Sequence, residues 1–203
     1  MNLRAFANET AKDIPAPGGG SISAYVGALG AALGTMVANL SAGKRGWDDQ
    51  LETFSAWAEK GQQLKDELLR LVDEDTNAFN QIMASFRLPK GTTEEKAARS
   101  QAIQVATQFA IETPMRTMEV AFQIFELAEA MVRDGNPNSV TDAGVGALCA
   151  RAAVHGAWMN VKINVQSLKD KELAASFLER AAAIAEQTDA LEAKIRGMVE
   201  EKI

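Results

Sequence analysis

Two aspartates are the residues of this chain best placed to transfer protons. Asp75 falls on an apolar helical stripe, between Val72 and Phe79, where a simple fold would carry a hydrophobic side chain. Asp142 falls on a second stripe, made almost wholly of small or polar residues. A buried carboxylate with a raised pKa can act as a general acid or base near neutral pH. Two ordinary roles stay open at this point, an ion pair for Asp75 and a helix cap for Asp142.

The lysines, the single cysteine and the single histidine limit which kinds of catalytic or metal site the chain can form. Lys44 follows a glycine-rich helix and is a candidate for anchoring an anionic substrate, with a solvated helix-end charge as the ordinary alternative. Cys149 is the only cysteine and His155 the only histidine. This disfavours a thiolate cluster, a His-ligated zinc site and a histidine-based catalytic triad. We therefore expect no metal, and chemistry that rests on carboxylates, lysines, amides and the backbone.

A proline- and glycine-rich run, Pro15-Ala16-Pro17-Gly18-Gly19-Gly20, leads into Ser21. The prolines stiffen the approach, and the glycines leave backbone that a ligand or a second chain can approach closely. Ser21 and Ser23 are expected to cap the helix that follows, whose free N–H groups favour an anion or a polar ligand. The alternative is a tight turn into a helix.

Helical periodicity dominates the chain, and no run shows sustained strand alternation. We expect one all-α domain over residues 1–203, a bundle of long antiparallel helices with a buried Gly/Ala-rich central helix. The pattern predicts helices over residues 21–40, 49–86, 92 onward, 141–168 and 170 onward. Thr92 with Glu95 forms a capping box, Ser139 with Asp142 resembles another cap, and Pro114 is expected to break or kink its helix.

Composition bounds the class of protein. The chain has 203 residues, of which 47% are apolar, enough for a single domain with a real core. Its net charge of -6 argues against non-specific nucleic-acid binding. The uncharged segment 21–42 could be read as a membrane span, but its Ala, Gly, Ser and Thr content favours the buried centre of a bundle. With no secretory leader visible in residues 1–13, we expect a cytoplasmic protein with no membrane partner.

Two helical stripes indicate surfaces that could contact a ligand, a neighbouring helix or a second subunit. The stripe that contains Asp142 is suited to a close neighbour or a bound molecule, and it continues through Gly146, Cys149, Ala153, Gly156, Asn160 and Ser167. In the last helix, apolar residues recur every seven positions and could serve a dimer contact: Phe177, Ile184, Leu191 and Met198.

Three motifs, in order along the chain, resemble the cyclodeaminase domain of the formiminotransferase-cyclodeaminase family. The first is the run from Pro15 to Ser21, followed by Gly27-Ala28-Leu29-Gly30 and Met36-Val37-Ala38-Asn39-Leu40. The second is Asp75-Thr76-Asn77-Ala78-Phe79, leading to Phe86-Arg87-Leu88-Pro89-Lys90. The third runs from Gly135 to Gly146 and continues to Asn164; here Thr141 stands where the family commonly has serine.

The resemblance implies an all-helical homodimer that binds a tetrahydrofolate derivative, with or without a polyglutamate tail, at or near the subunit interface. It implies catalysis by Asp142 and Asp75 with help from Lys44, and no cofactor beyond the folate. The folate would be lined by Gly18, Gly19, Gly20, Ser21, Asn39, Asn136, Asn138 and Ser139. Asn160 lies about 27 Å from Asp142 at helical rise, so it and Asn164 are expected at the far part of a long ligand or at a partner subunit.

Two reactions follow from the resemblance, both at the one-carbon bridge between N5 and N10. We place first the closure of 5-formiminotetrahydrofolate to 5,10-methenyltetrahydrofolate with loss of ammonia, a step of histidine degradation that needs a separate formiminotransferase. The alternative is a cyclohydrolase that interconverts 5,10-methenyl- and 10-formyltetrahydrofolate. A different class, a non-catalytic helical protein that only assembles or binds folate, also remains open.

Overall fold

The computed structural model describes residues 2–203 and contains, over that range, only helices and the segments that join them. The α-helices are α1 Leu3–Thr10, α2 Gly19–Ala42, α3 Leu51–Phe86, α4 Thr93–Phe122, α5 Ile124–Asp134, α6 Val140–Val165 and α7 Lys171–Glu200. Two short 3₁₀ helices, η1 Asp48–Gln50 and η2 Pro137–Ser139, precede α3 and α6. The all-α prediction is confirmed.

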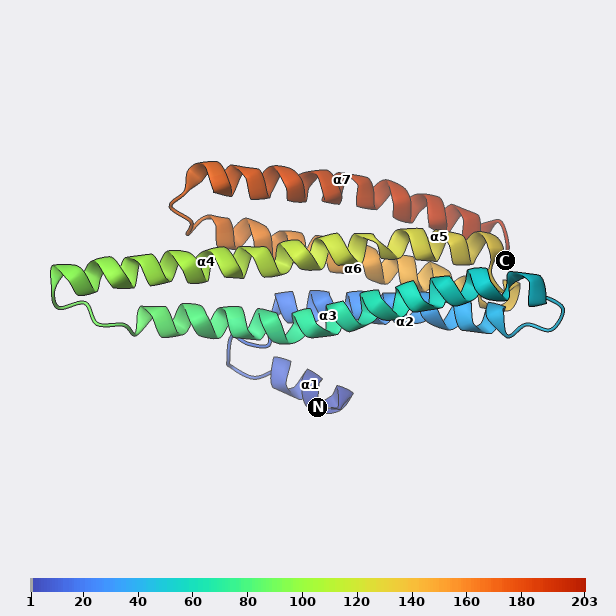
Figure 1. The fold of residues 1–203 in the computed structure, drawn as a ribbon, viewed down its shortest axis with the longest axis horizontal. Helices are drawn as coiled ribbons and strands as arrows, with labels where there is room; N and C mark the ends of the chain where they lie inside the picture. The colour runs from blue at the N-terminus through green and yellow to red at the C-terminus, as the bar shows by residue number, and fades with distance from the viewer. Residues whose placement is uncertain (1) are drawn as a thin grey trace.

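The long helices form an elongated antiparallel bundle (Figure 1). Helices α2, α3, α4, α6 and α7 alternate in direction, and α5 continues the line of α4. The short α1 lies outside the bundle, beside α3. The core is one cluster of buried side chains to which α2 through α7 all contribute.

The Gly/Ala-rich α2 is the buried central helix, as predicted. It packs against α3 on one side and α6 on another. A Cβ added to Gly30 would lie 2.8 Å from the Gly146 carbonyl oxygen of α6, so the two backbones touch only because both positions lack side chains. The small-residue stripe of α6 therefore serves a close helix neighbour.

Helix α2 is also long and apolar enough to cross a membrane by length and composition alone. In the bundle, 61% of its most apolar 18-residue window is buried. The 177–198 stripe of α7 likewise packs on the core: Phe177 is buried, and Ile184, Leu191 and Met198 are partly buried against the core cluster.

Two of the predicted helix caps are confirmed. Thr92 and Glu95 form the capping box of α4, in which the Thr92 hydroxyl accepts from the Glu95 N–H at 3.2 Å. Asp170 caps α7 by accepting from the Leu173 N–H at 2.9 Å. Ser139 stands at the N-cap position of α6 but makes no side-chain cap bond, so the predicted Ser139–Asp142 cap is wrong.

Of the predicted break or kink at Pro114, the break does not occur, because α4 runs through this proline without interruption. Proline has no N–H, so the carbonyl of Ala110, four residues earlier, has no helical donor. The Asn164 side chain of α6 supplies one, donating to that carbonyl at 2.7 Å. Helix α4 is interrupted later, at Gln123, where α5 begins.

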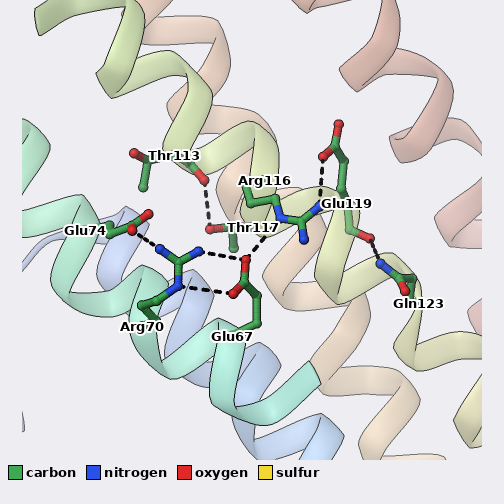
Figure 2. Close-up of polar contacts among 8 residues, drawn as sticks. All are labelled: Glu67, Arg70, Glu74, Thr113, Arg116, Thr117, Glu119 and Gln123. Carbon is green, nitrogen blue, oxygen red and sulfur yellow. Dashed lines mark hydrogen bonds and ion pairs between the residues drawn. The ribbon is translucent and has the colours of Figure 1, made fainter. Parts of the chain in front are cut away.

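An ion-pair network joins α3 to α4 on the outside of the bundle (Figure 2). The Glu67 carboxylate accepts from Arg70 at 2.8 Å within α3 and from Arg116 of α4 at 3.1 Å. Arg70 also pairs with Glu74. These contacts, the Arg70 hydrogen bond foremost, lower the pKa of Glu67.

Candidate functional site

The N-terminus of α2 is capped by Asp75 of α3. The Asp75 Oδ2 accepts from the Ser21 N–H at 2.8 Å and from the Ser21 hydroxyl at 2.8 Å. A helix N-terminus has N–H groups without helical partners, and a carboxylate there is stabilised by those donors and by the helix dipole. The expectation that Ser21 and Ser23 cap α2 is wrong: the Ser23 hydroxyl donates to the Gly19 carbonyl at 2.6 Å, and the cap is supplied from another helix.

Gly20 is the position that makes this cap sterically feasible. A Cβ at Gly20 would lie 2.0 Å from Asp75 Oδ1, well inside contact distance. At Gly19, by contrast, an added Cβ would meet only Asn160 Nδ2, at 3.6 Å. The bare backbone predicted from the sequence is therefore filled at Gly20 by Asp75 and left open at Gly19.

A cavity of about 140 Å³ opens where Asp75 meets the glycine run. Asp75 Oδ2 is engaged by Ser21, whereas Oδ1 accepts no hydrogen bond within residues 2–203. The cavity is lined by Pro15, Ala16, Gly18, Gly19, Gly20, Asp75, Ala78, Phe79, Ile82, Ala110, Asn160 and Asn164.

The two cavity asparagines have fixed amides. Asn160 Nδ2 donates to the Gly156 carbonyl at 2.9 Å, and Asn164 Nδ2 donates to Ala110. Because each NH₂ group is held by a carbonyl, the side-chain oxygens remain as acceptors. The sequence placed these residues away from Asp142 without assigning them to Asp75, and it did not indicate Phe79, Ile82 or Ala110. The signal for Asn164 was the orphaned carbonyl that Pro114 creates four residues before itself.

The remaining predicted residues lie around the other end of α2. The Asn136 N–H donates to the Ser41 hydroxyl at 2.8 Å, and the Asn136 side chain accepts from the Asn138 N–H at 3.2 Å. Lys44 Nζ lies 3.8 Å from the centre of the Trp47 ring. Ser139 and Asp142 follow directly at the start of α6, Ser139 buried and Asp142 half-buried.

Asn39 is exposed in a separate shallow groove near this end, beside Met36, Leu40 and Lys65. The Asp142 carboxylate forms no ion pair within residues 2–203.

One chain does not bring the three predicted catalytic residues together. Asp75 is bound at Ser21, whereas Lys44 lies beside Ser41, twenty residues along α2, or about 30 Å at helical rise. Asp142 lies between these ends: the antiparallel contacts of Gly27 with Ala153 and of Gly30 with Gly146 set it about 20 Å from Ser21 along α2. The sequence-predicted set therefore divides into a cavity end, with Asp75, Ser21 and the glycine run, and a far end, with the remaining residues.

The lone cysteine and the lone histidine both lie where helices pack against one another. Burial raises the pKa of the Cys149 thiol, which keeps it protonated and weakly nucleophilic, and its Cβ faces Gly30. His155 Nε2 lies 3.0 Å from Asp189 Oδ1, linking α6 to α7. Within residues 2–203, no three His, Cys, Asp or Glu side chains are grouped so as to hold a metal ion.

Comparison with known proteins gives a consistent picture. A sequence model of the formiminotransferase-cyclodeaminase family matches residues 2–183. The chain is 35% identical over 201 residues to a methenyltetrahydrofolate cyclohydrolase of Methylorubrum extorquens, covering 99% of this chain and 97% of that protein. It is 31% identical to a formimidoyltransferase-cyclodeaminase of Rattus norvegicus, and spans 37% of that longer chain.

The fold is also similar to that of a protein whose name includes cyclodeaminase. The crystal structure of a formiminotetrahydrofolate cyclodeaminase from Thermotoga maritima superimposes with a TM-score of 0.87 at 25% sequence identity. The match covers 99% of this chain and 96% of that one.

Proposed function

The chain belongs to the formiminotransferase-cyclodeaminase family of folate one-carbon enzymes, and we propose that it makes and breaks bonds at the one-carbon bridge between N5 and N10 of tetrahydrofolate. The observation that carries the proposal is the cavity at the α2 N-terminus, where one oxygen of Asp75 is anchored and the other is free. Such a carboxylate can accept and return a proton without moving.

We put cyclohydrolase activity first, because the 35% identity extends over the whole length of a methenyltetrahydrofolate cyclohydrolase. Water adds to the bridge carbon of the 5,10-methenyl cation and gives one proton to Asp75. The adduct collapses to 10-formyltetrahydrofolate as the bond to N5 breaks, N5 takes a proton, and one proton is released overall. A fixed carboxylate also favours the cationic substrate electrostatically.

Cyclodeaminase activity is the second candidate, supported by the full-length likeness to the Thermotoga maritima enzyme. In that reaction N10 attacks the formimino carbon and loses its proton, and the nitrogen that leaves as ammonia gains one. The same carboxylate serves both reactions, because only the incoming and leaving groups differ. This reaction requires a formiminotransferase as supplier of its substrate.

A homodimer is part of the proposal. Large apolar side chains are exposed on α2 and α6: Leu29, Met36, Leu40, Val145, Leu148, Met159 and Ile163. Leu29 precedes Gly30, and Val145 precedes Gly146, by one residue each. Because Gly30 and Gly146 touch and the helices are antiparallel, both positions emerge on the same side of the pair.

A twofold contact across this apolar face reverses the direction of α2 between the two copies when the twofold axis runs perpendicular to the helices, and this is the arrangement that we propose. It would place the cavity end of one copy toward the far end of the other, where Lys44 and Asp142 lie. This arrangement would reconcile the sequence-predicted catalytic set with its 30 Å division within one chain.

The test is an assay of the purified protein with each substrate. Hydrolysis of 5,10-methenyltetrahydrofolate above the buffer rate supports the cyclohydrolase. Formation of methenyltetrahydrofolate from 5-formiminotetrahydrofolate, matched by ammonia release, supports the cyclodeaminase. Folded protein that is inactive with both would favour the non-catalytic folate-binding alternative and contradict the enzyme proposal.

A further inference from the structure

Pro114 is a buried proline inside a long helix, and it does not itself line the cavity that holds Asp75. Proline in a helix interior costs stability, because it lacks the N–H that the carbonyl four residues earlier would accept and because its ring crowds that carbonyl. The proposed reaction makes no direct use of this residue. Its place in α4 is explained by what its missing N–H allows on a neighbouring helix.

The carbonyl that Pro114 leaves free holds the side-chain amide of Asn164. Asn164 Nδ2 reaches from α6 and donates to the Ala110 carbonyl of α4 at 2.7 Å. With any other residue at position 114, the backbone N–H would donate to this carbonyl and compete with the asparagine. The proline therefore selects one of the two orientations of the amide, with its nitrogen toward Ala110 and its oxygen turned away.

The oxygens of Asn160 and Asn164 are open acceptors beside Asp75. Both residues line the cavity, and neither Oδ1 accepts a hydrogen bond from any residue in the range 2–203. Over the same range, no fully buried side-chain oxygen or nitrogen lacks a hydrogen-bond partner, so both oxygens are accessible. Together with the ionised Asp75 carboxylate, they give the cavity three polar side chains that accept hydrogen bonds.

The two asparagines are held in different ways, and only one of them depends on the proline. Asn160 Nδ2 donates at 2.9 Å to the Gly156 carbonyl, one turn earlier in its own helix α6. The orientation of Asn160 is thus set within α6. The orientation of Asn164 is set by a carbonyl of α4, and it is this amide that a substitution at Pro114 would release.

We propose that Pro114 is a positioning residue of this site. By withholding an N–H from the Ala110 carbonyl, it keeps the Asn164 oxygen toward the cavity, where that oxygen accepts from an N–H group of the ligand. The inference rests on the proposed function for the identity of the ligand, a tetrahydrofolate whose reduced pteridine ring carries N–H groups. An Asn164 amide turned the other way would present its NH₂ group to those donors, and the ligand N–H would lose its acceptor.

The first experiment observes the Asn164 amide itself and needs no ligand. In ¹⁵N-labelled protein, the side-chain NH₂ signals of Asn164 are assigned by their loss in N164A. We expect their exchange with solvent to be about three- to tenfold faster in P114A than in wild type, the equivalent of one lost hydrogen bond. Equal exchange rates in the two proteins overturn the positioning role.

Thr117→Val is the matched control for this experiment. It removes another buried hydrogen bond of α4, in which the Thr117 hydroxyl donates to the Thr113 carbonyl at 3.1 Å, without touching the cavity. We expect it to leave the exchange of the Asn164 amide unchanged. Faster exchange in T117V to the same degree as in P114A would show that any weakening of α4 releases the amide, which also contradicts the proposal.

The second experiment measures calorimetrically the binding of 5-formyltetrahydrofolate, a stable relative of the substrate. We expect Kd to rise about three- to tenfold in P114A and at least as much in N164A. Because Pro114 acts through Asn164, the double variant P114A/N164A should bind no more weakly than N164A. Additive effects in the double variant, or an unchanged Kd in P114A, overturn the proposal.

Turnover separates positioning from a general loss of structure. In P114A we expect KM to rise with Kd while kcat falls less than about twofold, because Asp75 keeps its own contacts with Ser21. A loss confined to kcat contradicts the assignment. Failure of the wild type to bind 5-formyltetrahydrofolate would contradict the proposed function and the ligand contact together, whereas the amide exchange rates decide the effect of Pro114 on Asn164 independently.

Discussion

At the scale of single residues, the site depends on one absent side chain. Gly20 lets Asp75 Oδ1 occupy the position where a Cβ would lie, and this contact fixes the carboxylate on the α2 N-terminus. Helical periodicity in the glycine run cannot reveal this contact, because Asp75 lies 54 residues along the chain from Ser21, the residue it binds.

Gly20→Ala is therefore expected to destabilise the fold by about 1–3 kcal/mol, since Asp75 or the start of α2 must shift. Gly19→Ala is the matched control, because its Cβ would meet Asn160 Nδ2 at an ordinary 3.6 Å. Urea denaturation measures both free energies of unfolding. Equal effects of the two substitutions would show that the Gly20–Asp75 contact is not tight.

The sequence allowed individual candidate residues to be identified, but it did not allow us to predict which of them lie close together. Asp75 was found because it interrupts an apolar stripe, and the structure shows it both hydrogen-bonded and facing a cavity, the two alternatives that a half-buried carboxylate allows. Asp142 was found as a member of a stripe of small and polar residues, yet it lies toward the other end of α2. Helical periodicity gives the face on which a residue lies and says nothing of which residues of other helices meet it.

At the scale of elements, Asn164 and Pro114 are linked through one carbonyl. The missing N–H of Pro114 predicted a break or a kink, and the helix continues because the tertiary hydrogen bond from Asn164 to the Ala110 carbonyl compensates for that missing donor. The presence of the long helices was thus predictable from periodicity and caps. The continuity of α4, by contrast, depends on the hydrogen bond between Asn164 and Ala110, which are 54 residues apart along the chain.

Asn164→Ala is expected to cost about 1–2 kcal/mol of stability, because it leaves the Ala110 carbonyl without a donor. In a Pro114→Ala background, residue 114 regains an N–H for that carbonyl, so the same Asn164 substitution should cost less than about half as much. A double-mutant cycle of unfolding free energies measures the coupling. Additive effects would mean that Asn164 stabilises α4 by some other contact.

The Glu67 network makes a pH-dependent contribution to the α3–α4 contact (Figure 2). Because the folded-state pKa of Glu67 lies below its ordinary value, its stabilisation is present above the unfolded pKa and is lost as pH falls through the folded pKa. We expect Glu67→Gln to lower stability by about 1 kcal/mol or less at neutral pH, with the difference vanishing in acid. Thermal melts across pH, with exposed Glu179→Gln as control, measure this. A constant deficit at all pH values would point to lost packing instead of lost charge.

At the scale of the whole molecule, Asp75 and Lys44 lie at opposite ends of α2 and do not meet within one chain. The all-α bundle and its buried Gly/Ala-rich α2 were predictable, since an uncharged small-residue helix is stable in water only inside other helices. The 30 Å separation between Asp75 and the Lys44 end was not, because it follows from the antiparallel register of α2 and α3, in which Asp75 meets Ser21.

Leu148→Glu is expected to convert a dimer to a monomer by placing a charge on the apolar α2/α6 face, where Leu148 is 47% exposed in one chain. Val105→Glu, at a 59% exposed position on α4, is the control and should remain dimeric. Sedimentation velocity distinguishes the two masses. A monomeric wild-type protein would refute the dimer across this face.

The most direct test of the account compares Asp75→Asn with wild type for folate binding and for turnover of 5,10-methenyltetrahydrofolate and 5-formiminotetrahydrofolate. Asparagine keeps an oxygen for the Ser21 N–H but cannot carry the proton, and exposed Asp66→Asn on the same helix is the control. We predict that Asp75→Asn retains folate binding and loses about 10²–10⁴-fold in kcat, while Asp66→Asn is unaffected. Full turnover in folded Asp75→Asn would contradict the assignment of the reaction to this cavity.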